Sequence, residues 1–173
     1  VPRYQRTYVW KENNWSELLT DVTFTINTDS DANWSHFLGT IVLNDKNKNL
    51  GTAKDPGVDY YEIIDGQQRL TTIFVIFAVI VKHLNDMDNE EAENRAKFIK
   101  NTYLTTLKST NETISKINNP DLHSSLLSIL DYISKDSKVK LEKSNNTLYH
   151  VFNYFDDYIK EKSFEETDMF LNQ

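Results

Sequence analysis

Cysteine is absent from the 173-residue chain, and its absence excludes several kinds of site. The protein cannot contain a disulfide framework, a zinc site built on thiolates or a cysteine nucleophile. A chain without cysteine is compatible with a reducing, intracellular environment, so we expect a cytoplasmic location. The length suits one compact domain, to which a helical part can be appended.

Positive charge is also scarce. Lys and Arg number 19 against 26 Asp and Glu, which gives a formal net charge of -7. A protein that coats DNA needs concentrated positive charge, because it must neutralise phosphates. The composition therefore excludes a general DNA coat, and any contact with nucleic acid must use a local basic patch.

Long apolar runs are missing as well. The most apolar segment, Ile73–Val81, has nine apolar residues, whereas a membrane span needs about 20. This segment predicts a central helix that is buried on most sides, and we expect no membrane association. The chain begins Val1-Pro2-Arg3, without methionine or a signal-peptide pattern, and stops soon after a capping box at Ser163 and Glu166. We therefore expect a fragment that is truncated at both ends.

The remaining patterns divide the chain into two parts, 1–86 and 87–173. In the first part we expect an extended segment at 1–9, a helix that begins at a capping box of Asn14 and Glu17, and buried strands at Phe37–Leu43 and Tyr60–Ile64. In the second part apolar residues recur at helical spacing, and Asn119-Pro120 resembles a helix start. The sequence thus predicts an α+β core followed by an all-helical extension.

A strand, a tight turn and a helix meet at Asp65-Gly66. Gly66 permits a positive φ and close approach of the backbone, and the N–H groups of the first helical turn can bind an anion. Arg69 adds a forked positive charge, and Thr71 and Thr72 add hydroxyl groups. These groups suit a phosphate, and Asp65 could hold Mg²⁺ or orient a water molecule.

The same residues also have a purely local interpretation. Asp65 and Gln68 have the spacing of a capping box, and Gln67 and Arg69 could simply face solvent. The turn is no Walker loop, because one glycine precedes the helix and no lysine follows it. The pattern alone leaves a phosphate site and local structure as open alternatives.

The first eleven residues form a second candidate site. They contain three basic and three aromatic residues and no acidic residue. An extended strand would place Tyr4, Arg6 and Tyr8 on one face and Arg3, Gln5 and Thr7 on the other. Arginine beside aromatic rings suits phosphate binding and base stacking. An ordinary edge strand, with arginine stems over a core, explains the pattern equally well.

Taken together, the two segments resemble the N-terminal domain of GmrSD-type restriction endonucleases. The resemblance rests on VPRYQRTYVW at 1–10, HFLGTIVL at 36–43 and IIDGQQRLTT at 63–72. It is strong over residues 1–86 and only architectural beyond them. It implies a ParB/sulfiredoxin-like fold, with a small mixed sheet and helices, in which a Gly-x-x-Arg turn binds nucleotide phosphates. Gly66-Gln67-Gln68-Arg69 matches that turn.

The resemblance also implies a function for this chain. Such domains are implicated in binding and hydrolysing a nucleoside triphosphate, which controls a nuclease module that cuts modified foreign DNA. Asp65 and Gln68 would be the catalytic residues, with Mg²⁺ on Asp65. The nucleotide would be bound by Tyr4, Gln5, Arg6, Tyr8, Gly66, Gln67, Arg69, Thr71 and Thr72.

No nuclease centre is evident in the sequence. His36, His83, His123 and His150 are far apart and lack a local His-Asn-His spacing, so we expect a nuclease module, often of the HNH type, beyond Gln173 or on a partner subunit. Two other functions stay open. One is a DNA-binding or modification-sensing module that uses Arg3, Arg6, Lys11 and Arg69. The other is a structural interaction domain whose motifs serve only the fold.

Overall fold

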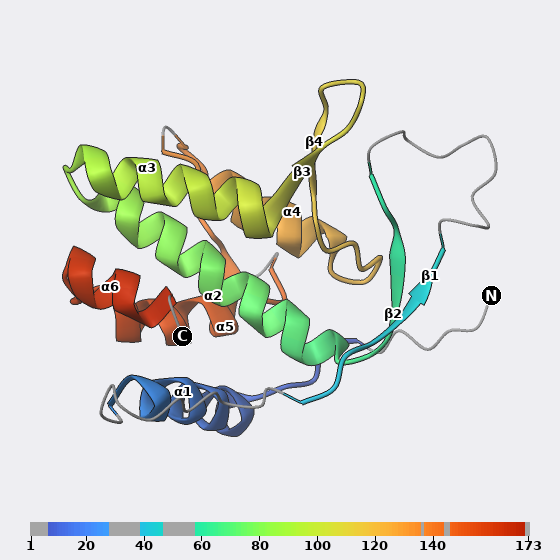
Figure 1. Ribbon diagram of the computed structural model, residues 1–173, viewed down its shortest axis with the longest axis horizontal. Coiled ribbons are helices and arrows are strands. Elements are labelled where there is room, and N and C mark those ends of the chain that lie inside the picture. The colour runs from blue at the N-terminus through green and yellow to red at the C-terminus, as the bar shows by residue number, and fades with distance from the viewer. Residues whose placement is uncertain (1–6, 28–38, 47–57, 136, 144–145, 172–173) are drawn as a thin grey trace.

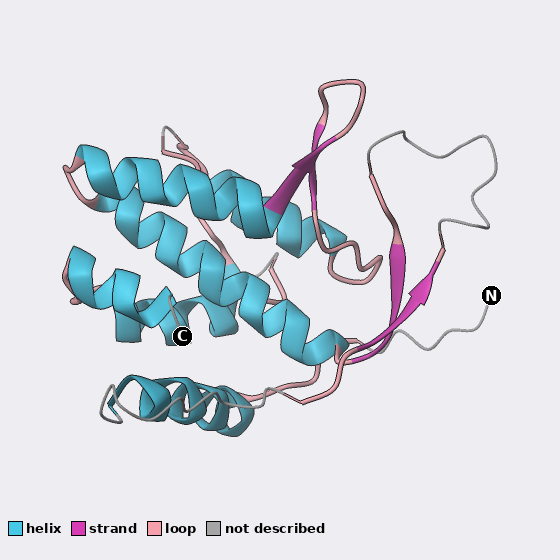
Figure 2. Cartoon of the chain, viewed as in Figure 1, coloured by secondary structure: helices cyan, strands magenta, loops and turns pink. Residues whose placement is uncertain are grey.

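The computed structural model describes residues 7–27, 39–46, 58–135, 137–143 and 146–171. Within them the fold is α+β, with six α-helices and two antiparallel sheets of two strands each (Figure 2). The elements follow the order α1 (Glu12–Asn27), β1 (Val42–Asp45), β2 (Tyr61–Asp65), α2 (Gln67–Asp86), α3 (Glu90–Ile99), a π-helical turn (Lys100–Leu104), β3 (Thr105–Leu107), β4 (Thr113–Ser115), α4 (His123–Tyr132), α5 (Tyr149–Ile159) and α6 (Phe164–Leu171).

The long helix α2 lies at the centre of the helical body (Figure 1). It packs against α3, α4 and α5, and its apolar middle, from Phe74 to Val81, is mostly buried. A helix that is apolar on most of its circumference is stable only where neighbours cover it. The prediction of a central buried helix is confirmed.

The hydrophobic core is built by helices. Its largest fully buried side chains include Phe152 and Phe155 of α5 and Ile80 of α2. Trp15 and Leu18 of α1 belong to the same buried cluster. The cluster therefore contains residues from both sides of the predicted domain boundary at residue 86, which stays a prediction.

The ribbon of β1 and β2 differs from the prediction. β2 lies within one residue of the predicted strand, but β1 covers Val42–Asp45 rather than Phe37–Leu43, and residues 39–41 form no strand. Leu43 lies opposite Ile63 and Asp45 opposite Tyr61. β1 is exposed along its whole length, and β2 is at most half-buried. The prediction of buried strands is wrong, because the ribbon extends from the helical body (Figure 2) and residues on both its faces are exposed. Phe37 lies outside the described residues.

A mixed sheet was expected, but the described strands form antiparallel pairs only. The ParB/sulfiredoxin-like fold therefore stays a proposal.

The second half is not entirely helical. A hairpin of β3 and β4 interrupts it, with Thr105 opposite Ser115 and Asn111 at φ 62° in the connecting turn. β-Branched threonines favour strands, and asparagine tolerates this left-handed conformation. The prediction of an all-helical extension is thus wrong, because the spacing of Tyr103 and Leu107 suggested a helical face that local β-propensity overrides.

Two predicted helix starts also shift. Helix α1 begins at Glu12 rather than at Asn14, whose Oδ1 accepts a hydrogen bond from Lys11 N at 3.1 Å. Helix α4 begins at His123, because Asn119 Oδ1 accepts from Asp121 N at 2.9 Å and closes a turn first.

The capping box at α6 is confirmed. Ser163 N donates to Glu166 Oε2 at 2.8 Å, and Glu166 N donates to Ser163 Oγ at 3.3 Å. No helix in the described part of the chain is long and apolar enough to cross a membrane.

We expect Phe155→Ala to lower the free energy of unfolding by about 3–5 kcal/mol, because it leaves a cavity at a fully buried site. Leu127→Ala is the matched control, because Leu127 is 42% exposed. Its free energy of unfolding should fall by only a few tenths of a kcal/mol. Urea denaturation of both variants tests this. Equal losses for both would contradict the helical core described above.

Candidate functional site

The side chain of Gln68 joins the first turn of α2 to the N-terminal segment. Its Oε1 accepts hydrogen bonds from Val9 N at 2.8 Å and Trp10 N at 3.3 Å. Its Nε2 donates to Thr7 O at 3.2 Å. Residues 7–10 have no regular secondary structure, so one amide side chain satisfies three backbone groups that no strand or helix would satisfy.

A buried chain of hydrogen bonds runs beside Gln68. The indole N–H of Trp15 can only donate, and it lies 2.9 Å from the Tyr8 hydroxyl. The Thr72 hydroxyl donates to Gln68 O at 2.9 Å. Tyr8 therefore accepts from Trp15 and donates to Thr72 Oγ1 at 2.7 Å. Burial raises the pKa of the Tyr8 phenol above its ordinary value, so the group that donates to Thr72 stays protonated at neutral pH.

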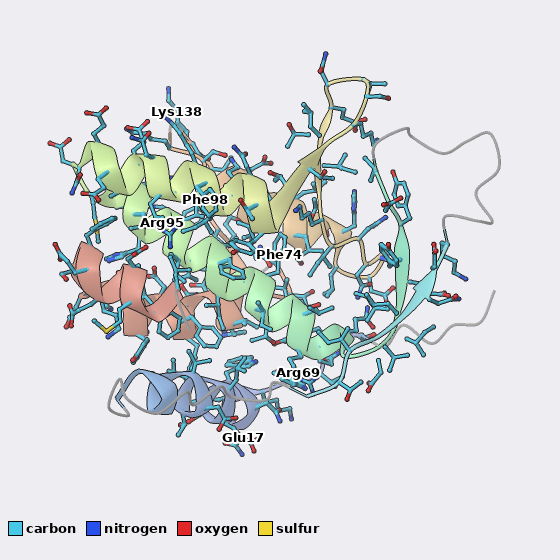
Figure 3. All side chains as sticks on the ribbon, viewed as in Figure 1. Glu17, Arg69, Phe74, Arg95, Phe98 and Lys138 are labelled. Atoms are coloured by element: carbon cyan, nitrogen blue, oxygen red, sulfur yellow. The ribbon has the colours of Figure 1, made fainter. Side chains whose placement is uncertain are left out.

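Two glycines allow the chain before β1 to approach the same helical turn. Gly39 has φ +86°, and a Cβ there would lie 2.8 Å from a guanidinium nitrogen of Arg69. Gly66 has φ +91°, and a Cβ there would lie 3.2 Å from Ile41 Cγ1. Arg69 donates to Thr40 O at 3.3 Å. Figure 3 shows Arg69 at the first turn of α2, beside the chain that leads into β1. The positive φ predicted for Gly66 is confirmed.

The N-terminus of α2 has no side-chain cap. The alternative interpretation, a capping box of Asp65 and Gln68, does not hold, because Gly66 occupies the cap position and the Gln68 amide binds the N-terminal segment instead. Leu70 N donates to Gly66 O at 2.9 Å. Within the described residues, the backbone N–H groups of Gln67, Gln68 and Arg69 therefore have no acceptor. They are the positive end of a 20-residue helix.

The charges around this turn are unbalanced. No carboxylate in the described part of the chain forms an ion pair with Arg69, and Asp65 lies exposed at the end of β2. Thr71 is 1% exposed, and its hydroxyl has no hydrogen-bond partner among the described residues. The described residues contain no group of three or more His, Asp or Glu that could hold a metal ion. The turn thus provides donors for an anion, and one carboxylate beside them.

The structure brings most of the predicted site residues together. Residues Gly66 to Thr72 form the start of α2. Asp65 directly precedes them at the end of β2, and Tyr8 contacts them through Thr72. Tyr4, Gln5 and Arg6, like Arg3 and His36, lie outside the described residues. The roles predicted for these residues in nucleotide binding and catalysis stay predictions.

The sequence analysis missed one residue of this site. Trp15 appeared only as an apolar position of a helix, yet its indole N–H anchors Tyr8. A tryptophan seven residues after a tyrosine carries no signal of this contact, which depends on how α1 packs beside α5.

We expect Tyr8→Phe to lower the free energy of unfolding by about 1–3 kcal/mol, because it leaves the buried Trp15 N–H without an acceptor. Tyr61→Phe is the matched control, since Tyr61 is 53% exposed. Thermal and urea denaturation measure both. A loss no larger in Tyr8→Phe than in Tyr61→Phe would contradict the hydrogen-bond chain.

The raised pKa of Tyr8 also predicts a pH dependence. Its stabilising contribution is complete below the unfolded pKa, near 10, and is lost as pH rises from there through the folded pKa. The wild-type protein should therefore lose stability more steeply than Tyr8→Phe above pH 10, by up to about 1 kcal/mol per pH unit. Urea denaturation at pH 9, 10 and 11 tests this. Parallel curves would show that the phenol is not protected.

A family model covers the part of the chain that carries these motifs. The model described as the GmrSD restriction endonuclease N-terminal domain matches residues 1–172. Among curated proteins, none matches the chain. The match spans both the motif-bearing first part and the helical second part. The chain therefore belongs to the family of GmrSD restriction endonuclease N-terminal domains.

Proposed function

We propose that this chain is a nucleotide-binding regulatory domain, with nucleoside triphosphatase activity, of a modification-dependent restriction endonuclease in defence against phage. Family membership supports the role related to restriction. The nucleotide is supported by one observation above all. Arg69 lies at a helix N-terminus that has no side-chain cap, and its guanidinium has no ion-pair partner among the described residues.

The chemistry of this turn matches a phosphate group. The backbone N–H groups of Gln67, Gln68 and Arg69 can donate to phosphate oxygens, and the helix dipole favours negative charge there. The planar guanidinium of Arg69 can bind two oxygens at once. Gly39 carries no Cβ, so its backbone can lie close to the Arg69 guanidinium, and Gly66 likewise lets the turn lie close to Ile41. The base of the nucleotide would then lie toward the N-terminal segment, and the sequence predicts that Tyr4, Gln5 and Arg6 of that segment bind the nucleotide.

Magnesium fits the same turn only together with a nucleotide. Mg²⁺ in nucleotide sites is usually bound by one or two carboxylates, by phosphates and by water. Asp65 is the carboxylate that directly precedes the turn, and it is exposed. We propose that Asp65 holds the ion or orients the attacking water. Both amide atoms of Gln68 are already engaged, so we propose that Gln68 positions the N-terminal segment.

The nuclease activity and the binding of DNA would belong to the whole endonuclease of which this chain is one part. We propose that the nuclease module lies outside residues 1–173 or on a partner subunit, and that nucleotide binding here controls it. DNA would then be a partner of the assembled endonuclease.

A structural role is the second candidate. It is favoured by the hydrogen bonds of Gln68, Tyr8 and Thr72, which place three motif residues in contacts that hold the fold together. On this interpretation Arg69 only fastens the chain at Thr40. The two candidates differ in what the loss of Arg69 does to ligand binding.

We expect Arg69→Ala to weaken binding of a nucleoside triphosphate at least tenfold, because charge-assisted hydrogen bonds contribute about 1.5–3 kcal/mol. Gly39→Ala should act in the same direction, since a Cβ would displace the guanidinium without removing its charge. Calorimetry of the full-length protein with the four triphosphates, with and without Mg²⁺, measures both. Phosphate release by Asp65→Asn separately tests the hydrolytic step.

Lys140→Ala is the control, because Lys140 is exposed and distant in sequence from the turn. A lower melting temperature in Arg69→Ala, with unchanged nucleotide affinity, would favour the structural role. Absence of binding at millimolar nucleotide, in wild-type protein with its native N-terminus, would refute the nucleotide site.

A further inference from the structure

A second candidate site lies where α1 and α5 begin. It is an open pocket of about 560 Å³, within the usual size range of small-molecule sites. One side comes from the N-terminal segment and the first residues of α1, and the other from the residues around the start of α5. The lining residues are Tyr8, Trp10, Lys11, Glu12, Asn13, Trp15, Thr147, His150 and Val151. Arg69 is not among them.

Three aromatic residues, Tyr8, Trp10 and Trp15, line this pocket and give it an apolar wall. Tyr8 and Trp15 are buried, and Trp10 is half-buried. The Tyr8 hydroxyl and the Trp15 N–H already bond to each other, and the hydroxyl also bonds to Thr72. Their polar atoms are therefore satisfied inside the protein, so these two residues reach the pocket through small apolar areas, and Trp10 is the more exposed aromatic residue of the lining. Aromatic side chains bind planar rings by stacking.

The rim of the pocket is suited to an anion. Lys11 and His150 are exposed lining residues, and two helices begin here. Helix α5 has no side-chain cap. At both helix starts some backbone N–H groups already donate to backbone oxygens, namely those of Asn14, Trp15, Tyr149 and Phe152. The others have no acceptor among the described residues, namely the backbone N–H groups of Glu12, Asn13, His150 and Val151. Two helix N-termini and a lysine make this edge electropositive, and Glu12 is the one lining carboxylate that opposes it.

We propose that this pocket binds a nucleoside phosphate, with the base against Trp10, Tyr8 and Trp15 and the phosphate at Lys11 and His150. A planar ring and an anion joined at short range match the aromatic wall and the electropositive rim together. The ligand can be a free nucleotide or a nucleotide unstacked from a DNA strand, since both present the same chemistry. This site shares Tyr8 with the surroundings of the turn at Arg69 but does not include Arg69, and it does not depend on the function proposed for that turn.

Tryptophan fluorescence of the full-length protein reports on this pocket directly, because two of the three tryptophans line it. Trp34→Phe removes the third and serves as the background. The probes are the four deoxynucleoside 5′-monophosphates, a single-stranded oligonucleotide, the nucleosides and inorganic phosphate. We expect saturable quenching by the monophosphates or by the oligonucleotide, and at least about tenfold weaker binding of nucleosides and phosphate, since each lacks one of the two contacts.

Matched variants locate the ligand. Lys11→Ala and His150→Ala should each weaken binding about fivefold to tenfold, as loss of a charge-assisted or polar contact does. Lys140→Ala and His123→Ala are their controls, since His123 likewise lies exposed at the start of a helix, α4, but does not line the pocket. Glu12→Gln should strengthen binding about twofold to fivefold by removing a like charge, whereas the exposed Glu17→Gln should not.

The outcomes separate the two sites and the two sources. Binding of monophosphates identifies a free nucleotide as the ligand, and binding of the oligonucleotide alone identifies a DNA strand; either supports the pocket. The proposal is overturned if no probe quenches at millimolar concentration. It is also overturned if phosphate binds as well as the monophosphates, or if binding is lost in Arg69→Ala but unchanged in Lys11→Ala and His150→Ala.

Discussion

The hydrogen bonds of the Gln68 side chain hold the N-terminal segment on the body of the protein. Residues 7–10 pair with no strand and belong to no helix, so their backbone groups need partners from elsewhere. One amide provides three such contacts. The position of that segment then determines where Tyr8 enters the core, where Trp15 meets it, and where α1 begins. Both candidate sites depend on this attachment.

Helical geometry explains why the Gly-Gln-Gln-Arg-Leu-Thr-Thr sequence can serve two neighbours at once. Gln68 and Thr72 are four residues apart and therefore share a face of α2. On this face Gln68 binds the backbone of residues 7–10, and Thr72 binds the Tyr8 hydroxyl. Arg69 is one residue further along, about 100° around the helix, and it meets Gly39 and Thr40. Between these two attachments, the helix N-terminus remains uncapped. The motif thus fixes chain segments on both sides of a turn and leaves its donors available.

Sequence patterns predicted what depends on local physics. Ile73–Val81 indicated a buried helix because its apolar run has no other stable solution, and Asp65-Gly66 indicated a turn because only glycine takes φ +91° without strain. The errors come from contacts between distant residues. The spacing of Asp65 and Gln68 favoured a capping box, but Gln68 forms its bonds with residues 58 to 61 positions away. The strands looked buried because Ile41, Val42 and Leu43 are apolar, yet no described element covers them.

Although the net charge is -7, three basic side chains lie at or near helix N-termini in the structure. Arg69 lies at the uncapped start of α2, and Lys11 and His150 lie near the starts of α1 and α5. Tyr8 connects these places, because its ring lines the pocket while its hydroxyl binds Thr72, three residues along α2 from Arg69. The Tyr8–Thr72 hydrogen bond is therefore a direct contact between the pocket and the first turns of α2, and a displacement of the Tyr8 side chain would disturb it.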